Sequence, residues 1–162
     1  IERITDAGAF AVVQRPLTPD QLAEVVKQAE IESQTQRILI IDDQADSARL
    51  LKEVLDENGH YRVYESHSGG EGMSMIARMR PDLIILDLRM PEMDGFAVLD
   101  ELQSNPETAN IPVMVVTADT LNADEEGNLA GIEILYKADL GQENYSQFIN
   151  GIRSHLGLNG EA

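Results

Sequence analysis

Residues 38–43 read Ile-Leu-Ile-Ile-Asp-Asp, and residues 83–87 repeat the pattern as Leu-Ile-Ile-Leu-Asp. Each stretch is a short apolar run without polar alternation that ends in acidic side chains. Such runs are typical of strands buried on both faces of a parallel sheet. Further out, residues 113–117 read Val-Met-Val-Val-Thr and residues 132–136 are mostly apolar. Residues 61–65 alternate more strongly, which predicts an edge strand.

Helical periodicity separates these apolar runs. The positions that share a predicted helix face are Ala48, Leu51, Val54 and Leu55; Met73, Ile76 and Met79; Phe96, Leu99 and Leu102; and Tyr145, Phe148, Ile149, Ile152 and Leu156. Gly59 and the pair Asn105-Pro106 predict helix ends, and Gly127 weakens the helical pattern of residues 121–130. Five strands that alternate with five helices predict an α/β fold, a (βα)5 parallel sheet with right-handed crossovers.

The composition excludes several classes of function. The 162 residues include 29 Asp and Glu against 12 Lys and Arg, a formal charge of -17, and no cysteine. Disulfide frameworks, thiolate zinc sites and thiol catalysis are therefore excluded, and three scattered histidines do not suggest a zinc site. The negative charge disfavours nucleic acid. No apolar run approaches the roughly 20 residues of a membrane span and no signal peptide is visible, so we expect a cytoplasmic domain without membrane contact.

Polar side chains end the predicted strands. In open α/β sheets, ligands bind at the carboxyl ends of strands, where the strand order reverses. With the order 2-1-3-4-5, the first and third strands are neighbours about 4.8 Å apart, so Asp42, Asp43 and Asp87 meet in one crevice. Thr117 and Lys137 end the next two strands and point the same way. A lone Asp-Asp pair would more often be a turn or helix cap, and it is the joint pattern that indicates a site.

Three carboxylates in one crevice repel one another. Two of them about 5 Å apart cost roughly 3 kcal/mol at an effective dielectric constant near 20. A proton, Lys137 or a cation offsets this cost, and Mg²⁺, which uses one or two carboxylates and several waters, is the natural candidate. A metal-bound carboxylate that faces a lysine and a hydroxyl suits a transferring phosphoryl group. A carboxylate can then act as nucleophile and become an acyl phosphate.

With these residues, the chain resembles the receiver domain of two-component response regulators over about residues 37–157. Residues 86–95, Leu-Asp-Leu-Arg-Met-Pro-Glu-Met-Asp-Gly, are similar to the phosphoacceptor loop of that family. Residues 40–43 resemble its acidic-pair strand, and residues 116–118 resemble its hydroxyl-bearing strand end. The resemblance implies a flavodoxin-like doubly wound sheet with the order 2-1-3-4-5, which agrees with the strand count.

The resemblance also implies roles for individual residues. Asp87 would accept a phosphoryl group from a phosphohistidine donor, either a histidine kinase or a histidine phosphotransfer protein, and would turn over no external substrate. The implied Mg²⁺ ligands are Asp42, Asp43, Asp87 and the backbone carbonyl of Arg89. Asp43 would bind the ion directly and Asp42 mostly through water. Thr117 and Lys137 would hold the phosphoryl oxygens.

The chain departs from the family pattern after the fourth strand. The family usually has an aromatic residue three positions before the lysine, which rotates inward upon phosphorylation; here that position is Ile134. Tyr136 is expected to face the other side of the strand. Ala138 replaces the usual proline, and the stretch from Thr117 to Lys137 is a couple of residues short. We expect intact phosphorylation chemistry and an altered output face around the fourth helix and fifth strand.

The first 36 residues form a separate segment. Residues 18–21, Thr-Pro-Asp-Gln, predict a helix start with a capping box, and Leu22, Val25, Val26 and Ala29 form one stripe. Residues 8–17 resemble the end of another receiver, with Arg15 in place of the lysine. We therefore divide the chain into 1–36, the last strand and helix of an upstream receiver; 37–157, a receiver; and 158–162, a tail.

A plain helical extension is the alternative for residues 1–36. In the upstream-receiver hypothesis, Phe10 to Val13 form a strand without a sheet, which favours pairing with another chain, such as in a homodimer, or docking on the same domain. The output would then be carried by neighbouring domains of a longer chain or by a surface partner.

Three other functions remain open. A Mg²⁺-dependent aspartate-nucleophile phosphohydrolase commonly carries a second Asp two positions after the nucleophile, where this chain has Arg89, which donates no proton usefully. A flavin-binding module needs a hydroxyl- and glycine-rich phosphate loop, whereas residues 42–46 are acidic. A degenerate receiver that serves as a docking module or phosphate sink is favoured by the altered region 117–138.

Arg89 and Asp119, each two positions past a site residue, are expected to control the access of attacking water.

Overall fold

The computed structural model describes residues 2–4, 11–13, 18–59, 61–141 and 145–158. The chain divides into two compact units, Ile1–Thr35 and Gln36–Ala162. Among the described residues, no helix combines the length and the apolar character that crossing a membrane requires.

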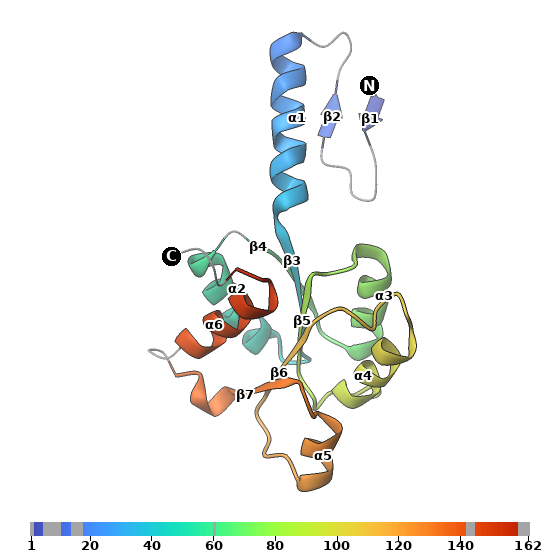
Figure 1. The fold of residues 1–162 in the computed structure, drawn as a ribbon, viewed down its shortest axis with the longest axis vertical. Helices are drawn as coiled ribbons and strands as arrows, with labels where there is room; N and C mark the ends of the chain where they lie inside the picture. Colours follow the sequence, from blue (N-terminus) through green and yellow to red (C-terminus); the bar gives the residue numbers. More distant parts are fainter. Residues whose placement is uncertain (1, 5–10, 14–17, 60, 142–144, 159–162) are drawn as a thin grey trace. The chain divides into compact units, whose positions relative to one another are not determined.

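The larger unit is built on a five-stranded parallel sheet (Figure 1). Its strands are β3 (Gln36–Ile41), β4 (Tyr61–Ser66), β5 (Leu83–Leu86), β6 (Val113–Thr117) and β7 (Glu133–Tyr136). The spatial order β4-β3-β5-β6-β7 corresponds to 2-1-3-4-5 within this unit, which confirms the predicted topology. The alternating segment, β4, lies at an edge as predicted, and β3 pairs with both β4 and β5.

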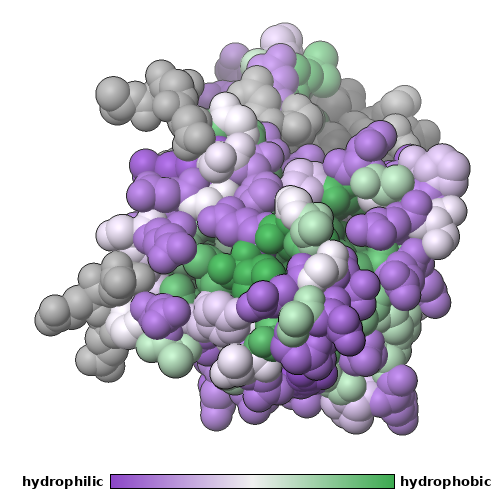
Figure 2. Space-filling model, turned by 60° about the horizontal axis from the view of Figure 1, so that its bottom comes forward, coloured by the Kyte–Doolittle hydropathy of each residue, from purple (hydrophilic) through white to green (hydrophobic). Residues whose placement is uncertain are grey.

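Helices cover both faces of the sheet. They are α2 (Ala45–Asn58), α3 (Gly69–Met79), α4 (Gly95–Ser104), α5 (Ala123–Asn128) and α6 (Ser146–His155), with a 3₁₀ turn, η1 (Lys137–Asp139). One hydrophobic cluster joins the sheet to α2 and α6, and a second joins its other face to α3 and α4. Figure 1 shows these helices on opposite sides of the strands. Hydrophilic residues dominate the face in Figure 2, and the most apolar residues gather mainly near its centre.

Burial on both faces explains the unbroken apolar runs. In β3, Ile38 and Ile40 belong to the first cluster, whereas Leu39 and Ile41 belong to the second. All four side chains have 0% exposure. Because successive side chains of a strand point to opposite faces, a strand covered on both sides has no position for a polar residue. Each such side chain contributes roughly 1.5–3 kcal/mol through its burial.

The helix faces follow the predicted stripes. In α2, all four stripe residues are buried, and in α6, Phe148, Ile149 and Ile152 are buried. In contrast, α5 has six residues and none of them is buried. Its flanking residues Leu121 and Leu129 are buried instead, so the weak pattern of residues 121–130 corresponds to a single short helix.

The predicted orientation of Tyr136 is wrong. Ile134 and Tyr136 both pack against the second cluster, while Leu135 between them belongs to the first. Residues two positions apart on a strand share a face, so Tyr136 lies on the same side of β7 as Ile134.

The smaller unit contains an antiparallel pair of strands and one helix. The strands β1 (Glu2–Ile4) and β2 (Ala11–Val13) pair with each other, and α1 spans Pro19–Gln34. The predicted capping box is present, since the backbone N–H of Thr18 donates to Gln21 Oε1 at 3.0 Å and that of Gln21 donates to Thr18 Oγ1 at 3.2 Å.

The expectation of a strand without a partner is wrong for the described part, because β2 pairs with β1. The short strand β1 has no apolar run that would have predicted it. Phe10 and Arg15 lie outside the described residues. The origin of residues 1–36 in an upstream receiver stays a prediction.

Replacing Gly95 by alanine should destabilise the larger unit by about 1–3 kcal/mol. A Cβ at Gly95 would lie 2.5 Å from the carbonyl oxygen of Asp87 and 2.8 Å from Cα of Leu88, and neither backbone atom can turn aside. Urea unfolding followed by circular dichroism measures the effect. Gly70→Ala, where a Cβ meets no atom within 4 Å, is the control and should be neutral or stabilising by up to about 1 kcal/mol. Equal midpoints for the two variants would contradict this account.

Candidate functional site

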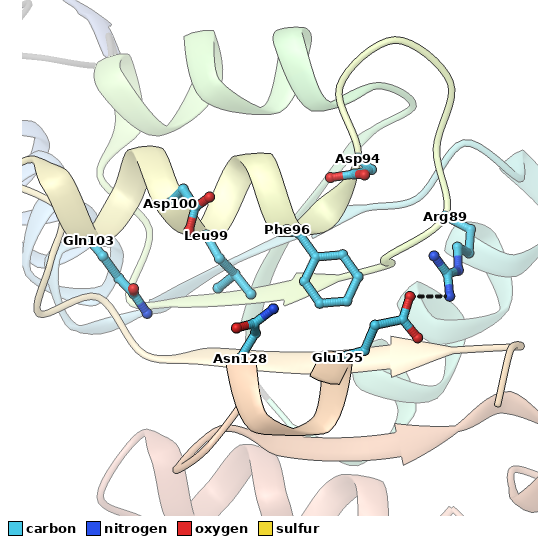
Figure 3. Close-up of a pocket in the computed structure, with 8 residues that line it drawn as sticks. All are labelled: Arg89, Asp94, Phe96, Leu99, Asp100, Gln103, Glu125 and Asn128. Atoms are coloured by element: carbon cyan, nitrogen blue, oxygen red, sulfur yellow. Dashed lines mark hydrogen bonds and ion pairs between the residues drawn. The ribbon is translucent and has the colours of Figure 1, made fainter. Parts of the chain in front are cut away.

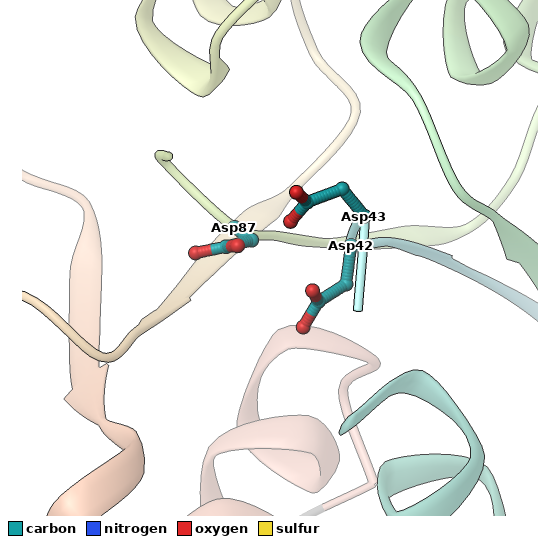
Figure 4. Close-up of side chains that lie close together, drawn as sticks. All are labelled: Asp42, Asp43 and Asp87. Carbon is teal, nitrogen blue, oxygen red and sulfur yellow. The ribbon is translucent and has the colours of Figure 1, made fainter. Parts of the chain in front are cut away.

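The carboxyl ends of β3 and β5 bring three aspartates together. The two strands are in parallel register with Ile41 opposite Leu86, and the backbone N–H of Asp87 donates to the carbonyl of Ile41 at 2.9 Å. Asp42 and Asp87 are therefore neighbours at the end of the sheet. One carboxylate oxygen from each of Asp42, Asp43 and Asp87 lies within 4.8 Å of the others, and Figure 4 shows the three side chains close together where the strands end.

Burial raises the free-energy cost of keeping these three carboxylates charged. Asp42 is 2% exposed and Asp87 is 5% exposed, while Asp43 is exposed at the rim. Burial raises the pKa of Asp87 to about 6, and the charges of Asp42 and Asp43 act in the same direction. The charge of Lys137 and a backbone hydrogen bond from Arg89 oppose the rise of that pKa. Ionisation of Asp87 therefore costs more free energy in the folded protein than it does for an aspartate in water.

Lys137 is the cation that reaches this cluster. It follows β7 as the first residue of η1, two strands away from β5, and its long side chain spans that distance. Its Nζ lies 2.7 Å from Asp42 Oδ2 and 3.7 Å from Asp87 Oδ2. Thr117 ends β6, between β5 and β7, and is fully buried. The structure therefore brings Asp42, Asp43, Asp87 and Lys137 together at the carboxyl ends of the strands, and Thr117 ends the strand between β5 and β7.

The donor set fits a divalent cation. Three ionised carboxylates carry three negative charges, and the ammonium of Lys137 balances one of them. The remaining charge matches Mg²⁺, whose ligands in proteins are oxygens. The side chain of Asp42 is already engaged, because it accepts a hydrogen bond from the backbone N–H of Gln44 at 2.9 Å in addition to its ion pair. Asp43 has no comparable partner among the described interactions, which suits direct binding of an ion.

The loop after β5 is tightly constrained. The backbone N–H of Gly95 donates to the carbonyl of Leu88 at 3.0 Å, which closes the loop, and Leu88 and Met90 are buried beneath it. Glu92 adopts a φ of 67°, a strained value for a residue with a side chain. These features hold Asp87 in a fixed position relative to the sheet.

Arg89 connects this loop to the other side of the crevice. Its Nε lies 3.1 Å from Asp119 Oδ2, and its guanidinium also lies 2.7 Å from Glu125 Oε1. The hydrogen bond with Glu125 raises the pKa of Arg89. A backbone hydrogen bond from Asn122, together with Arg89, lowers the pKa of Glu125. A pocket of about 440 Å³ lies beside this ion pair, lined mainly by α4 and α5 (Figure 3).

Sequence reasoning missed Glu125 and His67. Glu125 lies in the segment that appeared weak, although the spacing Asn122-x-x-Glu125 is that of a capping box and was visible in the sequence. His67 follows β4, and its Nδ1 lies 3.3 Å from the backbone carbonyl of Asp42. No sequence signal connects His67 with Asp42, because only the pairing of β3 with β4 brings them together.

The family model for the response regulator receiver domain matches residues 38–133, more than half of the chain. The chain belongs to the response regulator receiver family. Receivers of this family act in two-component signalling with histidine kinases or phosphotransfer proteins.

Individual relatives agree with this assignment. The receiver is 30% identical to the protein PilH of Pseudomonas aeruginosa over 117 residues, which cover 72% of this chain and 96% of PilH. It is 43% identical to the response regulator PleD of Caulobacter vibrioides over 82 residues, which cover 51% of this chain but 18% of PleD. The solved receiver domain of a putative Luxo repressor protein from Vibrio parahaemolyticus superimposes with a TM-score of 0.66 at 28% identity, covering 76% of this chain and 91% of that one.

Asp87 should give the metal-free receiver a pH-dependent stability. Its pKa rises from 3.8 to about 6 on folding, so the folded state binds the proton more tightly. The free energy of unfolding should therefore fall as the pH rises from about 4 to about 6 and stay lower above that, by about 3 kcal/mol. Asp87→Asn removes this loss and should be the more stable protein at pH 7 without Mg²⁺.

Urea unfolding in EDTA between pH 4 and pH 8 tests this expectation. Asp100→Asn, which changes an exposed carboxylate on α4, is the matched control and should keep the decline seen in the wild type. The assignment would be wrong if Asp87→Asn declined over that pH range as steeply as Asp100→Asn.

Proposed function

We propose that this receiver takes a phosphoryl group from a phosphohistidine donor onto Asp87 in a Mg²⁺-dependent reaction. The observation that carries the proposal is the cluster of three aspartates with Lys137. A nearly buried aspartate faces the pair Asp42 and Asp43 and lies 3.7 Å from a lysine ammonium. A purely structural aspartate would gain nothing from two further carboxylates at this distance, because they only raise the cost of its charge.

The reaction is a displacement at phosphorus. An oxygen of Asp87 forms a P–O bond while the P–N bond of the phosphoimidazole breaks, and the electron pair of the P–N bond stays on the imidazole nitrogen. Lys137 and the hydroxyl of Thr117 bind the phosphoryl oxygens and stabilise the negative charge that they carry. Lys137 would exchange part of its ion pair with Asp42 for this contact.

Mg²⁺ would be held by Asp43, Asp87 and the backbone carbonyl of Arg89, with Asp42 acting mostly through water. When bound, the ion neutralises phosphoryl oxygens and favours the ionised form of Asp87. That form is the nucleophile, and a pKa of about 6 leaves most of the carboxyl ionised at pH 7 even without the ion. No external substrate is turned over, since the acyl phosphate remains on the chain.

A receiver that serves as a docking module or phosphate sink is the second candidate. It is favoured by Ile134 at the usual switch position and by α5, which buries none of its side chains. In this alternative the output face does not change, whether or not the acyl phosphate forms.

We further propose that residues 1–36 derive from an upstream receiver and that neighbouring domains carry the output. The match to PleD, which spans 18% of that protein, supports a receiver within a longer polypeptide. A histidine kinase or a histidine phosphotransfer protein is the proposed donor.

Beryllofluoride, a mimic of the phosphoryl group, tests the proposed function directly. In the presence of Mg²⁺, the wild type should bind it, as followed by ¹⁹F NMR, and Asp87→Asn should not. Chemical shifts of β7 and α5 that change on binding would support the switch, whereas binding without such changes would support the docking module. Steady release of phosphate from added monoesters would instead support a phosphohydrolase.

Asp43→Asn should abolish the stabilisation of the receiver by Mg²⁺. If the ion binds the folded state, its presence at ten times the dissociation constant raises the free energy of unfolding by about 1.4 kcal/mol. Thermal unfolding with and without Mg²⁺ measures this difference. Asp46→Asn, which removes the same charge at an exposed position of α2, should respond like the wild type. A full Mg²⁺ response in Asp43→Asn would show that the ion binds elsewhere.

A further inference from the structure

The guanidinium of Arg89 lies between carboxylates from two other parts of the receiver. Asp119 belongs to the loop after β6, and Glu125 belongs to α5. The two ion pairs have N···O distances of 3.1 Å and 2.7 Å. Figure 3 shows Arg89 directed toward Glu125 at one end of the pocket. A side chain two positions after Asp87 therefore contacts the first turn of α5.

Glu125 also closes the capping box of α5. Its Oε2 accepts from the backbone N–H of Asn122 at 3.0 Å, and its own backbone N–H donates to Asn122 Oδ1 at 2.9 Å. Helix α5 has six residues, includes Gly127 and buries no side chain. So short a helix is marginal by itself, and its order depends on its cap and its flanks. The same carboxylate thus caps α5 and holds Arg89.

Arg89 and Asp119, which form one of these ion pairs, both lie in loops that follow site residues at the carboxyl end of the sheet. Arg89 stands two positions after Asp87, and Asp119 stands two positions after Thr117, with its backbone N–H 3.4 Å from Thr117 Oγ1. An ion pair between these two loops spans the edge of the crevice between β5 and β6. A phosphoryl group on Asp87 would carry about two negative charges on three acceptor oxygens, in place of the single charge of the ionised carboxylate. Guanidinium can bind such a group in a bidentate manner, as it binds a carboxylate, and the phosphoryl group offers it more charge than one carboxylate does.

We propose that Arg89 is a coupling residue that binds either Glu125 and Asp119 or the phosphoryl group on Asp87, so that modification of Asp87 releases the cap of α5. This inference rests on the proposed function of Asp87 and adds a route from the crevice to α5 through side chains of this chain. Because coupling is reciprocal, weakening the contacts of Arg89 with α5 must strengthen the binding of a phosphoryl mimic by the same factor.

Glu125→Gln tests the inference with little change to the helix, because glutamine keeps an oxygen that can accept the N–H of Asn122. Glu126→Gln is the matched control, since it removes the same charge from the next, exposed position of α5. With Mg²⁺ present, ¹⁹F NMR titration should show that Glu125→Gln binds beryllofluoride about 2- to 5-fold more tightly than the wild type, the range expected for an exposed ion pair. Glu126→Gln should bind as the wild type does.

Hydrogen exchange gives a second readout. In the wild type, saturation with beryllofluoride should speed exchange of the α5 amides about 2- to 5-fold. In Glu125→Gln these amides should already exchange faster before the addition and change little after it. Asp119→Asn, which breaks the other ion pair of Arg89, should also tighten beryllofluoride binding.

The outcomes separate this inference from the proposed function. Equal affinities in the wild type, Glu125→Gln and Glu126→Gln would overturn the coupling while leaving Asp87 as the phosphoacceptor. Equally tighter beryllofluoride binding in Glu125→Gln and Glu126→Gln would show that the effect comes from net charge alone. That result would also overturn the coupling. Absence of binding in the wild type would overturn the proposed function and the coupling together.

Discussion

Three carboxylates share one crevice at the ends of β3 and β5, and the lysine that reaches them balances one charge. This repulsion is the constraint on which the other features of the site depend. The repulsion among the carboxylates adds to burial, the main cause of the raised pKa of Asp87. It also makes the crevice suitable for a divalent cation, and it favours the ion pair of Lys137 with Asp42. A fold keeps such a cluster only if the remaining structure is stable enough to offset its cost.

That stability comes from the sheet. The central strands bury both faces, so that Ile38 to Ile41 are fully covered by helices on either side. The close approach of Gly95 to the backbone of Asp87 and Leu88 then fixes the loop that follows β5. The result is a closely packed base under Asp87, whereas other elements bury little of their own surface. Helix α5 is such an element, since its order depends on a cap and two flanking leucines.

Membership of the receiver family does not by itself say how the crevice communicates with the surface. This chain has Ile134 at the position where the family resemblance predicts an aromatic residue, and Tyr136 shares the face of Ile134. The ion pairs of Arg89 provide a different physical connection, from the residue two positions after Asp87 to the cap of α5. Because that connection consists of exposed charges, its strength is modest and sensitive to salt.

The spatial order of the strands was predicted through the family resemblance, whereas the amino-acid sequence by itself determined the strands and the residues at their carboxyl ends. These are local properties, because an apolar run predicts a buried strand and the acidic residue that follows it, Asp42 or Asp87, marks the end of that strand. Only the tertiary structure decided which of these charges are in contact, such as Lys137 with Asp42, 95 positions apart. The sequence also left out the pairing of β1 with β2 and the contact of Arg89 with Glu125, and it suggested the wrong face for Tyr136. Such contacts depend on distances between side chains from separate elements, and periodicity along the chain carries no information about those distances.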